Sequence, residues 1–255
     1  MPKAERVFRT EAIVLRRQDI GEADRLLLLL TPDHGKFRAV AHGTRKPAAR
    51  KTGHVELFTL VDMLIRRRGE WYVVAQAETK NAFLLLREDL VRNTYANHLA
   101  ELLDRFTSDQ DSSRAEFDLL ARALGWLCED LDPRTAARYY EIRLLALAGF
   151  APSLHYCSVG QEPLEPQDQF FSVADGGVIC PDHYFEQAHG MPISLTALKV
   201  LRHMQTQPWD AIKALHINTP LHLELERLTL AYITYLLEQR LQSVEFLRRL
   251  RREEL

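Results

Sequence analysis

The residues best suited to chemistry in this sequence are clustered cations. Between Gly43 and Gly53 the chain carries four of them, Arg45, Lys46, Arg50 and Lys51. Cations on a flexible loop bind phosphate groups, because each neutralised phosphate releases condensed counterions. The alternative is a solvated loop that is kept charged for solubility, and this loop alone favours neither interpretation.

Two further groups of cations favour a binding surface. Arg16 and Arg17 end a predicted strand, and the three arginines at 66–68 occupy a predicted turn. Residues 1–80 hold 16 Lys and Arg against 10 Asp and Glu, a balance of +6, whereas residues 81–255 hold 17 against 25, a balance of −8. A cationic module joined to an acidic body indicates a polyanion partner, most often nucleic acid. The candidate contact residues are Arg16, Arg17, Arg25, Lys36, Arg38, Arg45, Lys46, Arg50, Lys51, Arg66, Arg67 and Arg68.

Aromatic side chains that stack on bases would strengthen this interpretation. The cationic module contains Phe37, Phe58, Trp71 and Tyr72. Each of these residues fits the core of a small β-module better than an exposed platform. We therefore expect all four to be buried.

Cysteine and histidine residues suggest a second kind of site, a structural zinc centre. Such a centre commonly uses two Cys-x2-Cys pairs. The first pair would be Cys157 with Gly160, where glycine replaces the second ligand. The second would be Cys180 with His183, and His155 could complete a set of four. We favour a metal-free relic whose turns are held by packing, and we expect no metal and no other cofactor.

The sequence contains no catalytic constellation that we can identify. Gly35 and Lys36 resemble the end of a phosphate-binding loop, but Phe37 stands where a Ser or Thr is required. Neither G-x-S-x-G nor H-E-x-x-H occurs. We therefore expect a protein that is not an enzyme, and a nuclease or hydrolase with a dispersed site is the weakest alternative.

Five short strands are predicted to position the cations. Apolar runs, with glycines every 8 to 16 residues, predict strands at about 8–16, 25–31, 36–41, 54–66 and 71–79. In the third, Phe37, Ala39 and Ala41 alternate with Lys36 and Arg38, so one face should be buried and the other wet. Five strands with basic connections match an OB-fold, a small Greek-key barrel that often binds single-stranded nucleic acid.

After about residue 80 the pattern becomes helical. Apolar residues recur at helical spacing, with Pro133 suited to the first turn of one helix and Ser194 to the N-cap of another. Residues 149–192 hold five Gly and five Pro, which predicts a turn-rich insert. We expect an α+β multidomain protein, with an OB-fold barrel at 1–80, an α-helical bundle at 81–255 and, within the bundle, a degenerate zinc-finger-like insert at 149–192.

Composition also predicts the compartment. The chain has only three cysteines, an odd number, which argues against a disulfide-stapled secreted protein. Its longest purely apolar run, residues 26–30, is too short to cross a bilayer, and no secretory signal follows the N-terminus. We expect a cytoplasmic protein without a membrane segment.

Several short motifs occur in a characteristic order along the chain. They are GEADR at 21–25, TPDHGK at 31–36, VAHGTRK at 40–46, GFAPSL at 149–154 leading to Cys157, and Phe171-Ser172 with Gly176-Gly177 leading to Cys180. In these motifs the chain resembles one family, the bacterial RecO DNA repair proteins. The resemblance covers nearly the whole chain and follows the order of barrel, helical bundle and Cys-bearing insert.

The resemblance implies a nucleoid-associated recombination mediator without catalytic turnover. It implies binding to single- and double-stranded DNA without sequence preference, annealing of complementary strands, and contact with single-strand-binding protein and RecR during loading of the RecA recombinase. Many members carry a four-cysteine zinc site, of which this chain keeps half, and Thr44 and Pro47 also depart from the common pattern. The runner-up interpretation is a protein-interaction adaptor whose basic barrel binds an acidic protein or RNA.

Overall fold

The computed structural model describes residues 7–44, 52–109, 111, 114–129, 132–187 and 190–238. These residues divide into two compact units. The first extends to Ala96 and also takes Leu103–Cys128, while the second takes Asn97–Leu102 and the chain from Glu129 onward. The two units are therefore described separately.

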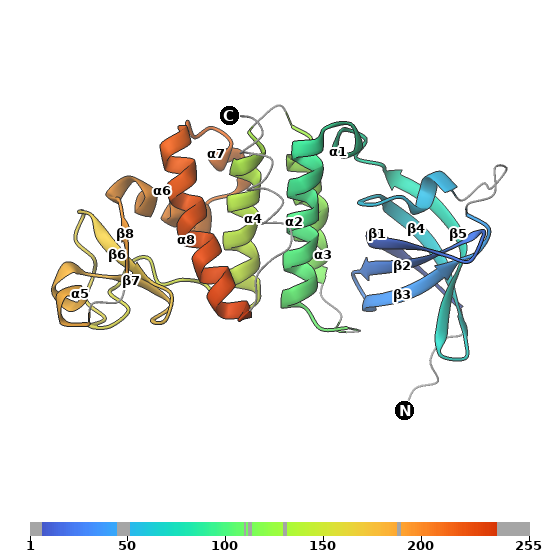
Figure 1. Ribbon diagram of the computed structural model, residues 1–255, viewed down its shortest axis with the longest axis horizontal. Helices are drawn as coiled ribbons and strands as arrows, with labels where there is room; N and C mark the ends of the chain where they lie inside the picture. The colour runs from blue at the N-terminus through green and yellow to red at the C-terminus, as the bar shows by residue number, and fades with distance from the viewer. Residues whose placement is uncertain are drawn as a thin grey trace. The chain divides into compact units, whose positions relative to one another are not determined.

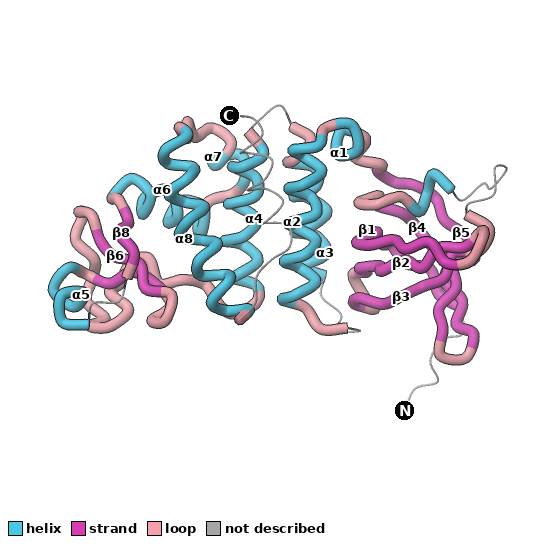
Figure 2. The backbone as a smooth tube through the Cα atoms, viewed as in Figure 1, coloured by secondary structure: helices cyan, strands magenta, loops and turns pink. Residues whose placement is uncertain are grey.

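The first unit is built on a closed five-stranded barrel (Figures 1 and 2). Its strands are hydrogen-bonded in the order β1-β2-β3-β5-β4, and β3 runs parallel to β5, which confirms the predicted OB-like fold. The core is formed by inward-facing side chains such as Leu27, Leu29 and Phe37, because alternate residues of a strand point to the same side. The strands are β1 (Val7–Ile20), β2 (Asp24–Thr31), β3 (Gly35–Ala41), β4 (Leu60–Arg68) and β5 (Trp71–Asn81).

Two strands have different bounds from those that the sequence pattern predicts. Residues 54–59 do not belong to the fourth strand, because a 3-10 helix η1 (Thr52–Val55) and a turn precede β4. Val55 and Phe58 are both buried, and a spacing of three suits a tight helical turn, whereas residues three apart on a strand point to opposite faces. Strand β1 continues to Ile20, since Arg16 and Arg17 still pair with β2, so these two arginines lie within a strand and not at its end.

Three helices follow the barrel: α1 (Leu85–Glu88), α2 (Leu90–Phe106) and α3 (Arg114–Trp126). They belong to the same unit, except for Asn97–Leu102 of α2, which belongs to the second unit. The C-terminal end of α2 and the residues after it pack against β3 at Gly35 and Lys36. Gly35 has a φ of +62°, and an added Cβ would lie 2.3 Å from the backbone oxygen of Asp111. Only glycine fits this position, because both the backbone conformation and the space exclude a side chain.

The second unit contains the helices α4 (Pro133–Leu147), α6 (Leu195–Thr206), α7 (Trp209–Ile212) and α8 (Thr219–Leu237). Pro133 lies in the first turn of α4, and the Ser194 side chain accepts a hydrogen bond from the Ala197 amide at the start of α6, so both terminus predictions are confirmed. None of the described helices combines the length and the hydropathy needed to cross a bilayer.

A buried charged cluster joins helices of the second unit. Oε1 of Glu141 lies 2.6 Å from Nε2 of His98 and accepts a 2.6 Å hydrogen bond from Arg138. Arg138 also donates to Oγ1 of Thr229 on α8, at 3.2 Å. The Glu141, His98 and Arg138 side chains are almost wholly inaccessible to water. A charge left here without its partner would be costly, so the cluster fixes the packing of these helices.

The turn-rich insert contains short elements of its own. They are β6 (Gln169–Ser172), β7 (Gly177–Ile179), α5 (Pro181–Gln187) and β8 (Met191–Ile193), and the strands form a sheet in the order β7-β6-β8. Figure 2 shows these strands beside the short helix α5. With only ten strand residues, the sheet is small, and the rest of the insert consists largely of turns.

Candidate nucleic-acid interface

The twelve candidate cations have different surroundings. Arg45, Lys46, Arg50 and Lys51 lie outside the described residues. The other eight are described, and all lie on the strands of the barrel. Three of them, Arg17, Arg25 and Lys36, are engaged in structural contacts, while the remaining five are exposed.

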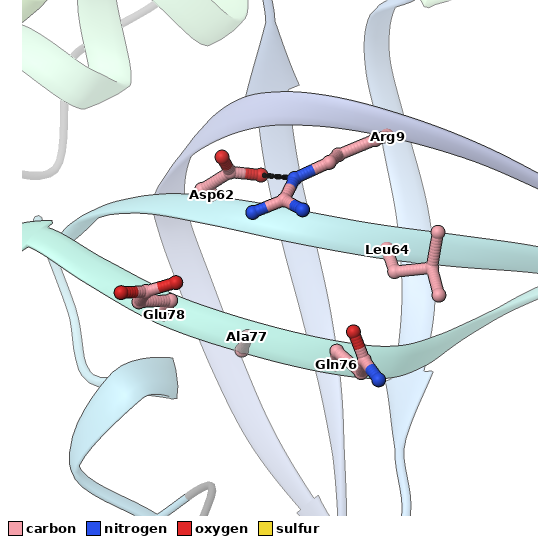
Figure 3. A pocket seen from close by; sticks show the side chains of 6 residues that line it. All are labelled: Arg9, Asp62, Leu64, Gln76, Ala77 and Glu78. Atoms are coloured by element: carbon pink, nitrogen blue, oxygen red, sulfur yellow. Dashed lines mark hydrogen bonds and ion pairs between the residues drawn. The ribbon is translucent and has the colours of Figure 1, made fainter.

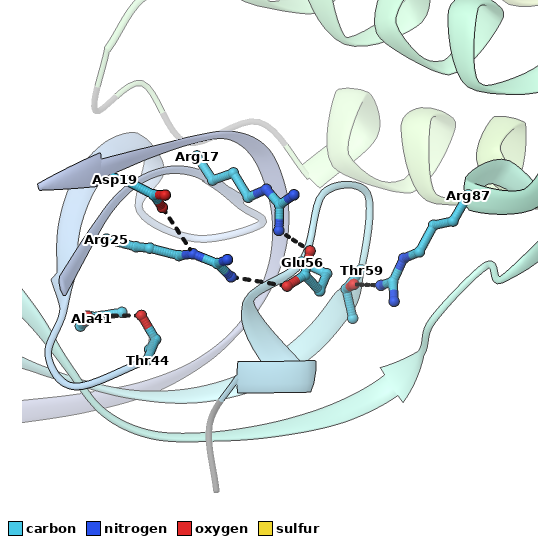
Figure 4. A network of polar contacts seen from close by, with 8 residues as sticks. All are labelled: Arg17, Asp19, Arg25, Ala41, Thr44, Glu56, Thr59 and Arg87. Carbon is cyan, nitrogen blue, oxygen red and sulfur yellow. Dashed lines mark hydrogen bonds and ion pairs between the residues drawn. The ribbon is translucent and has the colours of Figure 1, made fainter. Parts of the chain in front are cut away.

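Glu56 neutralises two of the candidates (Figure 4). One of its carboxylate oxygens accepts a 2.8 Å hydrogen bond from Arg25, and the other accepts one from Arg17. Arg25 also contacts Asp19 at 3.2 Å. Burial lowers the pKa of the Arg25 guanidinium, but its hydrogen bonds to the two carboxylates raise it by more, so the net change is upward. Arg17 and Arg25 therefore hold β1 and β2 to the turn that precedes β4.

Lys36 was expected on the wet face of β3, and the structure contradicts this expectation. The residue is 4% exposed. Its ammonium donates hydrogen bonds to the backbone oxygen of Asp104 at 2.8 Å, to Oδ1 of the same residue at 2.5 Å and to the Thr107 oxygen at 3.1 Å. Alternation along the strand is correct, but the end of α2 covers this position. All three donors of the ammonium are used within the protein, so we assign Lys36 a structural role.

The strand register places five outward-facing residues next to one another around the barrel. Arg16 on β1 pairs with Leu28 on β2, which pairs with Arg38 on β3. The β3–β5 register, Ala39 with Tyr72, puts Arg38 beside Trp71 one step back, and Trp71 pairs with Arg68 on β4. Directly opposed residues share a face of a sheet. We call Arg16, Leu28, Arg38, Trp71 and Arg68 the belt.

Trp71 is the one residue of the belt that sequence reasoning assigned to the core. It is 61% exposed. The reason is the alternation of β5, in which Tyr72 takes the inward position and packs 4.6 Å from the Phe37 ring. The expectation of burial is correct for Phe37 and Phe58, and Tyr72 is half-buried. Adjacent residues of a strand face opposite sides, so an inward Tyr72 was the sequence signal that could have placed Trp71 on the outside.

The belt combines charge with apolar surface. Arg38 and Arg68 are exposed, and no described carboxylate forms an ion pair with either of them. Arg66 lies on the same side of β4 as Arg68, since the two are separated by one residue. Arg67 points elsewhere, and its guanidinium lies 6.0 Å from the centre of the Tyr72 ring.

A shallow pocket of about 360 Å³ extends the belt at β1 and β2. Leu26 and Leu28 provide its apolar part, and Arg16 and Arg38 provide its cations. Arg16 is 2.9 Å from Asp104, so its charge is partly compensated at this edge. Arginines beside these half-buried leucines form a surface that could contact both the phosphates and the bases of a nucleic acid.

A second pocket on the barrel has the opposite character (Figure 3). It has a volume of about 300 Å³ and contains Arg9, Asp62 and Glu78. Arg9 donates a 2.8 Å hydrogen bond to Asp62, and this contact raises the pKa of the guanidinium. With two carboxylates for one cation, the pocket would repel a phosphate.

The insert brings together one group of potential metal ligands. Ligand atoms of Cys157, Glu162, Cys180 and His183 all lie within 4.8 Å of one another. The sequence pattern had suggested His155 as the fourth member, but that residue is exposed and does not belong to the group. Glu162 was missed because it lies outside the Cys-x2-Cys frame.

The closed five-stranded barrel and the helices that follow it define a protein of the OB-type class, with a helical region after the barrel. Comparison with known families gives the particular family. Residues 6–83 match the family described as "Recombination protein O N terminal", and residues 87–245 match "Recombination protein O C terminal". The chain therefore belongs to the RecO family.

Individual relatives agree with this assignment over nearly their whole length. A protein of Roseiflexus sp. is 37% identical over 95% of this chain and 86% of its own length. One of Dehalococcoides mccartyi is 36% identical over 97% and 98%, and one of Desulforamulus reducens is 33% identical over 96% and 95%. All three are named DNA repair protein RecO. Family membership supports a role in DNA repair and recombination.

Proposed function

We propose that this chain is a non-enzymatic recombination mediator that binds single- and double-stranded DNA through the belt. It binds without sequence preference, anneals complementary strands and helps to load the RecA recombinase on DNA coated with single-strand-binding protein. RecR and single-strand-binding protein are its protein partners. The observation that carries the proposal is the outward row of arginines interrupted by Leu28 and Trp71.

The physical argument rests on which groups the belt offers. Arginines neutralise backbone phosphates, a contact that carries no sequence information. Trp71 offers a ring face on which any base can stack. Neither group reads base edges, so binding would be independent of sequence. A cationic surface that holds two strands also reduces their mutual repulsion, which favours annealing.

The test compares two double variants that lose the same charge. Arg38→Ala with Arg68→Ala removes two exposed arginines of the belt, and Arg9→Ala with Arg122→Ala removes two exposed arginines elsewhere in the same unit. Affinity for a fluorescent oligothymidine is measured by anisotropy over a range of salt concentrations. Each phosphate contact contributes about −0.7 to the slope of log K against log salt for single strands. The belt variant loses two such contacts, so its slope should be less negative than that of the parent chain by about 1.4.

The control variant should retain the slope of the parent chain. Equal slopes for the two double variants would remove the belt from the interface. If the parent chain itself shows a flat salt dependence and binds an acidic protein instead, the adaptor interpretation replaces the mediator. Annealing of complementary oligonucleotides, bare or coated with single-strand-binding protein, then tests the mediator activity directly, and the belt variant should anneal more slowly than the control.

A further inference from the structure

Four side chains of the insert meet at one point with donor atoms of three kinds. The Cys180 thiol lies 3.1 Å from Nδ1 of His183 and 3.0 Å from Oε1 of Glu162. The same imidazole nitrogen is 3.2 Å from Oε1 of Glu162 and 3.6 Å from the Cys157 sulfur. A single nitrogen, one oxygen and two sulfurs therefore surround a common centre.

These separations match the edges of a tetrahedral metal site. Zinc binds sulfur at about 2.3 Å and nitrogen or oxygen at about 2.0–2.2 Å, so neighbouring ligand atoms of a tetrahedron are about 3.3–3.8 Å apart. The four separations given above, 3.0 to 3.6 Å, are close to these edges. An ordinary hydrogen-bonded cluster does not require all four atoms to converge.

Gly160 provides the space for the carboxylate. A Cβ at this position would lie 2.1 Å from an oxygen of Glu162 and 2.3 Å from Cε1 of His183. The glycine that replaces a second cysteine of the first pair therefore does more than delete a ligand. It leaves room for a carboxylate that comes from two residues further along the chain.

The surrounding backbone also directs two amides at the Cys157 sulfur. The Gly160 and Cys180 amides both lie 3.5 Å from this sulfur and point toward it. The Cys157 side chain is fully buried. A divalent cation at the common centre would offset the charge of the sulfur and carboxylate ligands that it binds, whose ligand atoms lie within 4.8 Å of one another.

We propose that Glu162 is the fourth ligand of a divalent-metal site completed by Cys157, Cys180 and His183. The metal is of the class that accepts sulfur, nitrogen and oxygen together, with Zn²⁺ foremost. Four protein ligands close the coordination sphere, so the metal links the turn after Cys157 to the start of α5 and has a structural role. This replaces the metal-free interpretation of the insert and is independent of how the barrel binds DNA.

The full chain is stripped of metal with a chelator, and binding of Zn²⁺ is measured by competition with a chromophoric chelator. We expect one equivalent to bind. Glu162→Gln should raise the dissociation constant at least about tenfold, since even residues that only orient a ligand affect metal affinity by this much. Glu165→Gln removes an exposed carboxylate three residues away and should leave the dissociation constant unchanged.

A second variant keeps the test decisive if Glu162→Gln folds poorly. Glu162→Cys adds a third sulfur at the same position, so the Co²⁺-substituted chain should show a stronger thiolate-to-cobalt absorption band than the parent. Failure of the parent chain to bind Zn²⁺, equal affinity of the Gln variants at 162 and 165, or no added band for the Cys variant would each overturn the proposal.

Discussion

Replacement of Trp71 should weaken the proposed binding of DNA while leaving the stability of the barrel almost unchanged. The side chain is 61% exposed and lies in the belt between two arginines. Stacking of one base on an aromatic ring contributes about 1–3 kcal/mol, so Trp71→Ala should weaken binding of oligothymidine about 5- to 150-fold. Because most of the ring is already in water, we expect the free energy of unfolding to change by less than about 1 kcal/mol.

Two assays measure these quantities. Anisotropy of labelled oligothymidine gives the dissociation constant, and urea denaturation gives the free energy of unfolding. Tryptophan fluorescence adds a direct signal, because stacking on a base quenches an exposed indole, and this quenching should disappear in the variant. Leu84→Ala is the matched control, since Leu84 is 59% exposed in the same unit and lies outside the belt.

Duplex DNA sharpens the test. Its bases are stacked on one another, so their faces are not available to an indole, whereas its phosphates remain accessible to arginines. Trp71→Ala should therefore weaken binding of single strands much more than binding of duplexes. Unchanged affinity for oligothymidine, or an equal loss for both forms of DNA, would refute the stacking role of Trp71.

Two further predictions concern buried charged or titratable residues in the second unit. Glu141→Gln leaves the buried Arg138 charge uncompensated and should lower the free energy of unfolding, measured by urea denaturation, by about 3–5 kcal/mol. The control, Asp33→Ala, breaks only an exposed ion pair with Arg114 and should lower it by less than about 1 kcal/mol. Burial lowers the pKa of His222 to about 4, so the folded state keeps this imidazole neutral. The free energy of unfolding should therefore fall by up to about 3 kcal/mol as the pH drops from about 6.5 toward 4. The His222→Gln variant should lack this part of the pH dependence when its stability is measured over the same range.

The strands and helix termini could be predicted because their signals are local. Alternation fixes which residues of β3 face inward, and Pro133 and Ser194 each satisfy a rule that concerns one helical turn. The segment before β4 could not be predicted in the same way. The apolar content of this segment suits a strand, whereas the spacing of Val55 and Phe58 suits a 3-10 turn. Packing against β1 favours the turn, through the hydrogen bond from the Phe58 amide to the Val14 oxygen.

Sites that combine distant residues were harder to predict. Three of the four residues in the cluster of potential metal ligands could be predicted, because Cys157, Cys180 and His183 follow a known spacing. Glu162 was hidden, since its place beside them depends on the turn at Gly160 and on the space that the glycine leaves. A carboxylate outside a motif gives no signal of its own in a chain with 35 acidic residues.

Charge balance predicts the candidate interface only to the level of the barrel, because the barrel uses several of its cations for structural contacts. Arg17 and Arg25 form ion pairs with Glu56, and Lys36 forms one with Asp104. These three cations therefore hold strands and a helix in place. What remains outside is decided by strand register. Neighbouring strands are about 4.8 Å apart, so Arg38 lies about 10 Å along the belt from Arg16 on one side and from Arg68 on the other, with an apolar or aromatic side chain in each interval. A single strand of DNA likewise alternates charged backbone with stacking bases, and this correspondence, more than the total charge, is why the belt suits a single strand.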